Sequence, residues 1–385
     1  MGMRWGSAAE AGFDPERLER AFAVVAERTG GPQVPGAVAA VGRGGTGVGP
    51  RAFGWAVYAP EGERVAAAPD TLFDLASLTK VVGTATAVWL LIEDGRVSLG
   101  DRFADLLPAF APVPGGEPAG WRREVTLRHL LTHTAGLPAG RALAQVPGGR
   151  AERLAATAAT PLEARPGERC VYSDLGFILL GWLVEEISGE TEDAFCRRRV
   201  FAPLGMVSTG WCPAPELAQS AAATEWVQAD GHAGYLRGRV HDENARSLAG
   251  LAGHAGLFAP AADMAVFADT LCAGGIGGAP GRPPERLLSA AAVRRFGTAV
   301  VIGEESSRTL GWQAPGRAGV LYGDLWTDRA FGHTGFTGTS LWIDPGQDVW
   351  MVLLTNAVHM GRAVGLPAMG RLRTYFHNAV MAALV

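Results

Sequence analysis

The chain has 385 residues, of which 48% are hydrophobic and 19% are charged, and its formal net charge is −4. This composition excludes a disordered chain, because enough apolar surface is present to form a sizeable core. The length fits two or three small domains, or one large enzyme built from two interleaved subdomains. A slightly acidic chain without a basic stripe or polybasic cluster excludes nucleic acids and anionic membranes as partners.

Targeting and cysteine patterns point to a cytoplasmic protein. Residues 1–22 lack the basic start and apolar centre of a signal peptide. The apolar runs at 88–92 and 177–184 are shorter than the ~18–20 residues that span a bilayer. The cysteines show neither CxxC spacing nor histidines at zinc-ligand spacing. We interpret all of them as ordinary buried thiols: Cys170, Cys196, Cys212 and Cys272.

The first part of the chain predicts a helix, two strands and a second, mostly apolar helix. Residues 14–29 begin with Asp-Pro-Glu, precede two glycines and carry apolar residues at helical spacing. Strand-like runs follow at 34–42 and 51–59. The run at 78–93 predicts a helix that ends at the Asp-Gly pair after it.

The only lysine of the chain lies at the start of that second helix. Among 34 Lys and Arg residues, counting along the sequence gives 33 Arg and one Lys, which is Lys80. A lysine retained against this bias suggests chemistry that arginine cannot perform, because a buried lysine can lose its proton. Ser77 stands one helical turn earlier on the same face. A desolvated lysine there can supply the base that a serine nucleophile needs, and the helix N-terminus favours negative charge.

Two further short motifs follow in chain order. Tyr-Ser-Asp at 172–174 opens an apolar helix over 175–185, and His-Thr-Gly stands at 333–335. Each of these motifs alone is a weak signal. Three motifs in this order, the first of which contains the only lysine, form a strong signal for a serine nucleophile.

The C-terminal part predicts a hairpin and a last helix. Residues 339–344 and 348–355 flank a Pro-Gly pair, which is typical of a β-hairpin. A final helix is expected at 366–384. The middle of the chain, about 99–290, is rich in Ala, Gly and Pro and predicts short helices with long connections.

On these motifs the chain resembles the class C β-lactamase and penicillin-binding-protein-like serine hydrolase family. That family, in its broad sense, includes D-Ala-D-Ala carboxypeptidases, family VIII esterases and related transacylases. Besides the His-Thr-Gly motif, the likeness is carried by residues 34–41, 71–80, 130–137, 171–177, 240–245 and 252–258.

The resemblance implies an α+β, β-lactamase-like fold that forms a single catalytic domain over 1–385. An antiparallel sheet flanked by helices would come from about 1–98 and 291–385, with a mainly helical subdomain inserted at about 99–290. The active site would lie at the junction of the two subdomains, where ligand sites tend to fall.

The resemblance also implies roles for individual residues. Ser77 would be the nucleophile that attacks an ester or amide carbonyl, and Lys80 would help to deprotonate it. Tyr172 would carry the proton from the serine to the leaving group. How Lys80 and Tyr172 divide that proton is left open. The backbone N–H groups of Ser77 and Phe336 would form the oxyanion hole.

Two positions depart from the pattern of the family. Asp174 stands where Asn is usual; a carboxylate can pair with Lys80 but cannot donate to a substrate carbonyl, which argues against efficient β-lactam binding. His333 stands where β-lactamases carry lysine, and would supply a hydrogen bond and a pH-dependent charge. Thr334 and Gly335 would complete this substrate-binding segment.

The expected function is therefore a serine acyl-enzyme hydrolase that cleaves a small ester or amide, with a small acyl donor and water as its partners. With an alcohol or amine as acceptor, the same motifs would serve an intracellular transacylase of natural-product biosynthesis. A β-lactamase or D-Ala-D-Ala carboxypeptidase ranks lower, because residues 1–22 lack a leader.

Two expectations concern alternatives outside this class. Because Asp174 could leave an acyl-enzyme that never turns over, a non-catalytic acyl sensor on the same fold is also open. No cofactor is expected. His241, Asp242 and His254 could be imagined as metal ligands, but they lie in a loop rich in Gly and Ala without a known metal pattern. The oligomeric state is left open.

Overall fold

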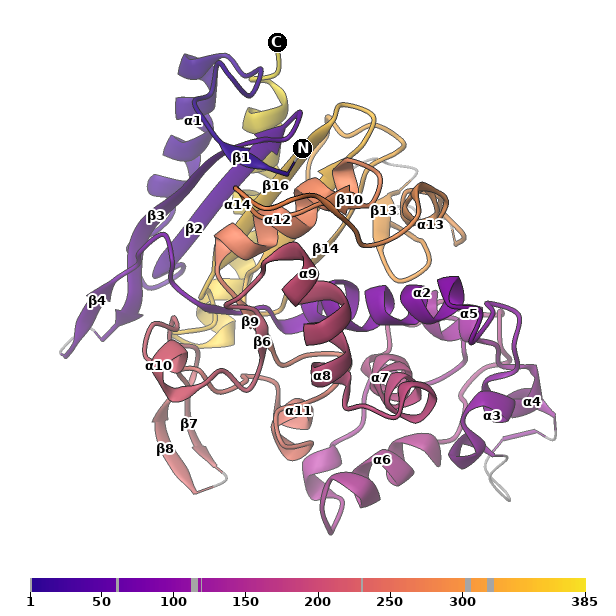
Figure 1. Cartoon of the computed structure of the whole chain (residues 1–385). Helices are drawn as coiled ribbons and strands as arrows, with labels where there is room; N and C mark the ends of the chain where they lie inside the picture. The colour runs from indigo at the N-terminus through magenta and orange to yellow at the C-terminus, as the bar shows by residue number, and fades with distance from the viewer. Residues whose placement is uncertain are drawn as a thin grey trace.

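Both ends of the chain contribute strands to one large sheet (Figure 1). This computed structural model describes residues 2–59, 62–111, 117–118, 120–229, 231–301, 306–316 and 322–385. The strand order is β1-β3-β2-β16-β15-β14-β13-β12, with β4 paired to β3. Neighbouring strands are antiparallel except for β1 and β3. The bounds are β1 Arg4–Trp5, β2 Gly36–Arg43, β3 Thr46–Tyr58, β4 Arg64–Ala66, β12 Ser306–Arg308, β13 Gln313–Pro315, β14 Phe331–Thr334, β15 Ser340–Asp344 and β16 Val349–Thr355.

The central strands are buried on both sides because their side chains alternate between two cores. In β16, Val352 enters the core that faces the helical half of the molecule, whereas Met351 and Leu353 enter the second core. The predicted hairpin of β15 and β16 is confirmed. Strand β3 begins at Thr46, earlier than predicted, because a register shift between Ala39 and Val41 lets the Gly-Pro pair inside β3 remain in the sheet.

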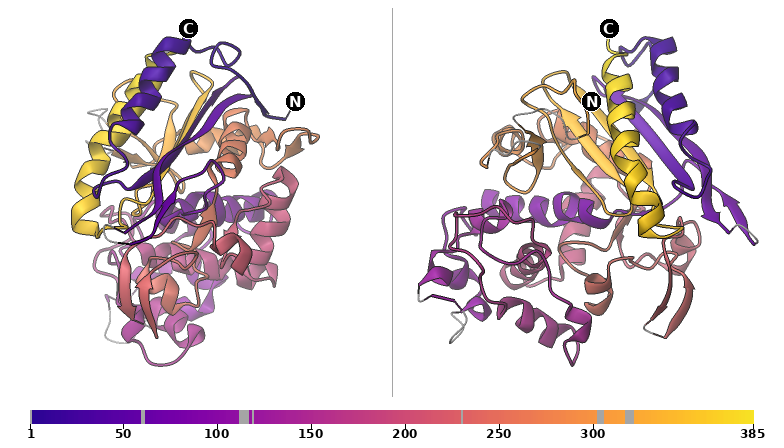
Figure 2. Two further views of the ribbon diagram at one scale, coloured as in Figure 1. Left: turned by 90° about the vertical axis from the view of Figure 1, so that its left-hand side faces the viewer. Right: turned by 180° about the vertical axis from the view of Figure 1, so that it is seen from behind.

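Helices cover both faces of the sheet. The helices α1, Pro15–Ala26, and α14, Arg362–Met381, pack against each other on one face, as Figure 2 shows. The helix α12, Ala261–Cys272, packs against β2 and β16 on the opposite face. Helix α1 confirms the prediction, and the Asp14 side chain caps it by accepting the Arg17 N–H at 2.9 Å. Helix α14 begins earlier than expected, because Pro367 is accommodated inside it.

The rest of the chain forms short helices and long connections, as predicted. The division of the chain into two subdomains stays a prediction. The remaining α-helices are α2 Thr86–Glu93, α3 Phe103–Leu106, α4 Trp121–Glu124, α5 Leu127–Leu131, α6 Arg150–Ala158, α7 Asp174–Ser188, α8 Glu192–Cys196, α9 Ala202–Leu204, α10 Pro215–Ala218, α11 Glu243–Ser247 and α13 Ala290–Phe296. The small strands are β5 Phe73–Asp74, β6 Gly210–Trp211 and β9 Leu257–Ala259, with the hairpins β7 Trp226–Ala229 and β8 His232–Tyr235, and β10 Ile276–Gly277 and β11 Glu285–Arg286.

One apolar segment contacts both β14 and α7, and we call it the central helix (76–93). It was predicted as a single α-helix, but it begins with a 3-10 turn, Ala76–Leu78, and a π-helical turn, Lys80–Ala85, before α2. By length and composition this segment is apolar enough to cross a membrane, which corrects the expectation that every apolar run is too short. In the structure 83% of it is buried inside the protein.

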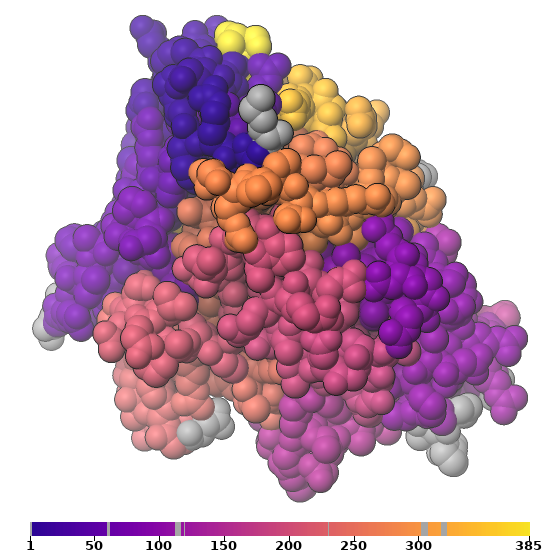
Figure 3. Space-filling model, in the orientation of Figure 1, coloured from indigo at the N-terminus to yellow at the C-terminus, as the bar shows by residue number. Residues whose placement is uncertain are grey.

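The N-terminal residues pack against the segment that carries β10 and β11. In the space-filling view the indigo N-terminal residues lie beside the orange segment that carries β10 and β11 (Figure 3), and the Met3 N–H donates to the Gly278 carbonyl at 3.2 Å.

The four cysteines are free thiols that differ in their exposure. Cys196 is buried, Cys272 is half-buried, and Cys170 and Cys212 are exposed. The prediction of four buried thiols is therefore wrong for three of them, which lie near the surface rather than in the core.

Candidate active site

Ser77 lies at the start of the central helix in a turn that is held by a buried carboxylate. The Asp74 side chain accepts the Ala76 N–H at 2.8 Å and the His241 N–H at 2.7 Å. Ala76 has a φ of 46°, a left-handed conformation that costs a non-glycine residue ~1–3 kcal/mol. The turn is thus fixed by contacts that hold the residue before the serine in a strained conformation.

Lys80 is fully buried and is the centre of the site. Its Nζ lies 3.0 Å from Ser77 Oγ and 3.0 Å from the backbone oxygen of His254, to which it donates hydrogen bonds. The same Nζ forms an ion pair with Asp174 Oδ1 at 2.8 Å, and the Asp174 side chain is 31% exposed. An ammonium group has three donors, and this geometry offers it three acceptors.

The ion pair decides which form of Lys80 the site favours. Burial alone would lower the pKa of Lys80, but the charges and hydrogen bonds of Asp174 and Tyr172 outweigh burial and raise it. Lys80 is therefore an ammonium group at neutral pH, and in this structure it donates a hydrogen bond to Ser77 Oγ. The sequence left this division of the proton open.

Tyr172 lies close to two cations. Its ring centroid is 4.9 Å from Lys80 Nζ and 5.1 Å from the guanidinium carbon of Arg308. The ring also lies 4.6 Å from that of His133. Two positive charges therefore lie close to this ring. Arg308 was missed by the sequence analysis, because nothing in its local sequence relates it to residue 172.

His133 packs against the second motif, residues 172–174. Its Nδ1 accepts the backbone N–H of Ser173 at 3.1 Å, and its ring lies 5.2 Å from that of Phe177. Burial, with the charges of Arg308 and Lys80, lowers the pKa of His133 well below its usual value, so this ring is neutral.

The third motif lies on β14 and the turn that follows it. His333 Nδ1 donates to the backbone oxygen of Thr334 at 2.8 Å, since a carbonyl can only accept. Burial and the charge of Arg308 lower the pKa of His333 well below its usual value. At neutral pH His333 therefore offers an uncharged Nε2 acceptor and no pH-dependent charge, which differs from the expectation.

The turn after β14 is clamped onto the serine turn. Thr337 Oγ1 donates to the backbone oxygen of Asp74 at 2.7 Å, and Thr339 Oγ1 donates to the backbone oxygen of Leu75 at 3.0 Å. A Cβ at Gly335 would lie 2.1 Å from Thr339 Oγ1 and 2.4 Å from the Leu75 oxygen, so only glycine fits there. Buried Arg373 donates to the Gly335 and Thr339 oxygens, each at 2.9 Å. These clamps were not predicted from the sequence.

These elements meet at a cavity of about 400 Å³. It is lined by the sequence-predicted residues Ser77, Tyr172, His333, Thr334, Gly335 and Phe336. Lys80 and Asp174 do not line this cavity; Lys80 contacts Ser77, and Asp174 contacts Lys80. The structure therefore brings all predicted site residues together, and adds Arg308 and Arg373 to the cavity wall.

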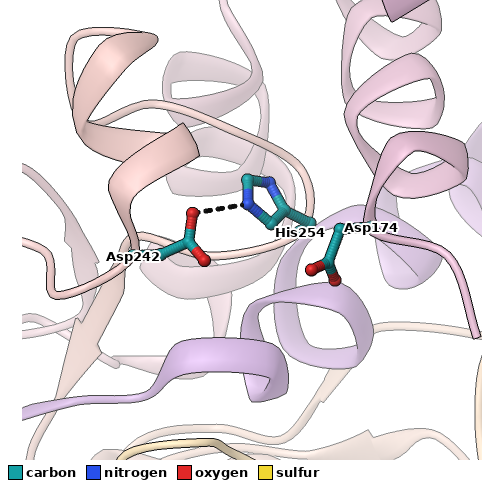
Figure 4. Close-up of side chains that lie close together, drawn as sticks. All are labelled: Asp174, Asp242 and His254. Carbon is teal, nitrogen blue, oxygen red and sulfur yellow. Dashed lines mark hydrogen bonds and ion pairs between the residues drawn. The ribbon is translucent and has the colours of Figure 1, made fainter. Parts of the chain in front are cut away.

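A second polar cluster lies beside Lys80. The ligand atoms of Asp174, Asp242 and His254 lie within 4.8 Å of one another (Figure 4). Asp242 Oδ1 is 2.8 Å from His254 Nε2, and this contact holds the pKa of Asp242 below its usual value although burial would raise it. Asp174 is engaged by Lys80. Because these ligand atoms already serve protein partners, we interpret the cluster as part of the charge network around Lys80 and not as a metal centre.

Comparison with known proteins places this constellation in a family. A family model described as Beta-lactamase matches residues 21–373. The chain belongs to the beta-lactamase family. An inferred D-alanyl-D-alanine carboxypeptidase of Escherichia coli strain K12 is 34% identical over 319 residues, which cover 77% of this chain and 71% of that protein.

Several solved structures share the fold of this chain. EstCE1, a hydrolase with promiscuous acyltransferase activity, has a TM-score of 0.74 at 22% identity, over 95% of this chain and 98% of its own. Simvastatin synthase from Aspergillus terreus has a TM-score of 0.69 at 22% identity, over 97% of this chain and 96% of its own. The chain has the α+β beta-lactamase-like fold and is an enzyme of the beta-lactamase superfamily.

Proposed function

We propose that the protein is a serine acyl-enzyme hydrolase that cleaves a small ester or amide with Ser77 as its nucleophile. The observation that carries this proposal is the contact of 3.0 Å between Ser77 Oγ and Lys80 Nζ at the wall of the cavity. A serine hydroxyl that is held by a buried cation and lies beside a phenol is equipped for nucleophilic attack.

In the first step Ser77 Oγ attacks the substrate carbonyl carbon and its proton passes to Tyr172. Arg308 and Lys80 flank the Tyr172 ring and stabilise the phenolate form that accepts this proton. Lys80 stays an ammonium group and keeps Ser77 aligned. The backbone N–H groups of Ser77 and Phe336 stabilise the negative carbonyl oxygen, a contribution worth ~10²–10³ in rate for each donor.

In the second step the bond to the leaving group breaks, and Tyr172 returns the proton to the departing alcohol or amine. The product is an ester between the acyl group and Ser77 Oγ. Water then attacks this ester through the same proton transfers in reverse order, which releases the acid and restores the serine. An alcohol or amine that enters in place of water gives acyl transfer, the alternative reaction of the same site.

Asp174 favours esters over β-lactams and other substrates with an acyl amide. Its carboxylate takes the position beside Lys80 at 2.8 Å and has no N–H to donate to a substrate carbonyl. The cavity of about 400 Å³ lies within the ~300–1,000 Å³ of ordinary ligand pockets, so it has room for a small ester.

A second candidate is a carboxypeptidase, the activity inferred for the Escherichia coli relative. The observation that favours it is Arg308 on the cavity wall, whose buried Nη1 has no hydrogen-bond partner within the described part of the chain. A guanidinium group with an unused donor is suited to a substrate carboxylate.

Steady-state assays with p-nitrophenyl esters, a D-alanyl-D-alanine peptide and a penicillin separate these functions. We expect turnover of short-chain esters by the wild type and none by Ser77→Ala. Peptide turnover that exceeds ester turnover, and that Arg308→Gln lowers much more than ester turnover, would replace the proposal with the second candidate. An acyl adduct without turnover of any substrate would indicate the acyl sensor.

A further inference from the structure

A buried carboxyl group lies beneath the site and takes no part in the mechanism above. Glu192, the first residue of α8, is 1% exposed. Its Oε1 lies 2.6 Å from Thr84 Oγ1, which belongs to the central helix. No ion pair involves Glu192 within the described ranges, although buried acids are normally paired with a cation.

The hydrogen bonds of Thr84 define the protonation state of Glu192. Thr84 Oγ1 is 2.6 Å from Glu192 Oε1 and also 2.6 Å from the backbone oxygen of Gly253. The threonine hydroxyl has one proton, and the Gly253 oxygen can only accept, so Thr84 donates to Gly253. The short contact with Glu192 Oε1 then requires a proton on the carboxyl group, which donates to Thr84.

This chain of hydrogen bonds ends at Lys80. Gly253 is followed by His254, whose backbone oxygen accepts the hydrogen bond from Lys80 Nζ at 3.0 Å. A Cβ at Gly253 would lie 2.2 Å from the Phe177 oxygen, so the backbone is tightly packed here. The bond from Thr84 therefore tethers the 252–257 loop at the point where this loop holds Lys80.

Ionised Glu192 would break the tether. A carboxylate is a stronger acceptor than a carbonyl, so it would take the Thr84 proton and leave the Gly253 oxygen facing the Thr84 oxygen without a hydrogen between them. Two oxygens at that distance repel each other. The 252–257 loop would then move away from the central helix, and the His254 oxygen would move with it.

The surroundings of Glu192 keep it neutral at ordinary pH. Burial, with the negative charges of Glu185 on α7 and Asp193 on α8, raises its pKa to about 8, while Thr84 and Arg150 on α6 oppose this rise. Arg150 is itself paired with Glu185 at 2.9 Å. Cys196, one turn along α8, has a pKa raised well above its usual value by burial and stays a neutral thiol.

We propose that Glu192 is a positioning residue whose proton holds the 252–257 loop, through Thr84, in the place where His254 binds Lys80, so that alkaline pH inactivates the enzyme when that proton is lost. This inference rests on the proposed function of Lys80 and Ser77. It adds a residue that contacts neither the substrate nor the reacting atoms.

The test is the pH profile of kcat/KM for a p-nitrophenyl ester with wild type, Glu192→Gln, Thr84→Ser and Thr84→Val. A glutamine amide donates to Thr84 at every pH, so we expect Glu192→Gln to stay active above pH 8 where the wild type falls by roughly tenfold per unit. Thr84→Ser should follow the wild type, and Thr84→Val should lose activity at all pH values. Superimposable alkaline limbs of wild type and Glu192→Gln would overturn the proposal.

Asp263→Asn is the matched control. Asp263 is also a buried acid whose pKa burial raises, to about 6, but its partners are Ser208 and Thr209, away from Lys80. This variant should leave the alkaline limb unchanged, and an equal shift in it would contradict a specific role for Glu192.

Thermal unfolding as a function of pH supplies a readout that does not depend on ester turnover. The folded state holds the Glu192 proton more tightly than the unfolded state, so this stabilisation is complete below pH ~4.5 and is lost as pH rises through 8. The Tm of the wild type should therefore fall relative to that of Glu192→Gln across this window. A constant difference would overturn the proposal, whereas absent ester turnover with a pH-dependent difference would overturn only the proposed function.

Discussion

Replacement of Asp174 by Asn restores the residue that is usual at this position in the family, and tests what the carboxylate does there. The Asp174 carboxylate lies 2.8 Å from Lys80 Nζ, and its side chain is 31% exposed. Asparagine keeps an oxygen that can accept from Lys80 and adds an N–H₂ group that can donate to a substrate carbonyl. We expect this variant to gain reactivity with acyl groups that carry an amide, such as penicillins, relative to simple esters.

The expected gain in reactivity follows from one neutral hydrogen bond that Asp174→Asn would add, between the new amide group and a substrate carbonyl. Such a bond contributes ~0.5–1.5 kcal/mol, and 1.36 kcal/mol corresponds to a factor of ten in rate. The ratio of acylation rates, penicillin over ester, should therefore rise by about two- to tenfold. Loss of the carboxylate also removes the main group that raises the pKa of Lys80, so this pKa should fall in the variant.

The assay measures second-order acylation rates with a penicillin and with a p-nitrophenyl ester on the same preparations. Thermal unfolding should show a loss of about 1–2 kcal/mol, because Lys80 keeps three acceptors but exchanges a charged one for a neutral amide oxygen. Asp263→Asn, a carboxyl-to-amide change outside the site, should leave the ratio of rates unchanged. An unchanged ratio in Asp174→Asn would refute the reasoning that the carboxylate excludes amide-bearing acyl groups.

Three further variants probe the lysine and the clamp on the serine turn. Lys80→Arg should lower ester turnover by about 10²–10⁴-fold, because a planar guanidinium cannot direct donors to the same three acceptors; ester assays that show nearly full activity would contradict this. Gly335→Ala should destabilise the fold by ~1–3 kcal/mol and impair acylation, since its Cβ would collide with Thr339 and the Leu75 oxygen; urea unfolding and acylation rates measure both. Arg373→Met should lose ~2–3 kcal/mol of stability through its two bonds to backbone oxygens, and an unfolding midpoint equal to that of the wild type would contradict it.

The parts of the fold that the sequence predicts are those set by local periodicity. Helix α1 has its capping Asp14 and its apolar stripe within one short segment, and the β15–β16 hairpin has alternating apolar strands around a Pro-Gly turn. The π-helical turn at Lys80–Ala85 has no such local signal. It is accompanied by a bond from Thr86 Oγ1 to the Val81 oxygen at 2.7 Å, inside a fully packed core.

Some residues of the site are likewise predicted by local spacing, whereas others are identified only by contacts in the folded chain. The spacing of Ser77 and Lys80 predicts that they share a helix face, and chain order places the other motifs near them. The roles of Arg308 and Glu192 depend on contacts with residues more than a hundred positions away. Their burial and charge environment exist only in the folded chain, so spacing alone could not reveal them. A glutamate just after the capping Thr191 predicts only an exposed first turn of a helix.

The central claim is that Ser77 carries the acyl group, and intact-protein mass spectrometry with an activated ester tests it most directly. Wild type and Ser77→Ala are sampled within seconds of mixing and again after minutes. The account predicts a mass increase equal to the acyl group on the wild type alone, followed by its decay, and faster decay when an alcohol or amine acts as acceptor. An adduct of equal yield on Ser77→Ala, or turnover of the ester without any adduct dependent on Ser77, would contradict it.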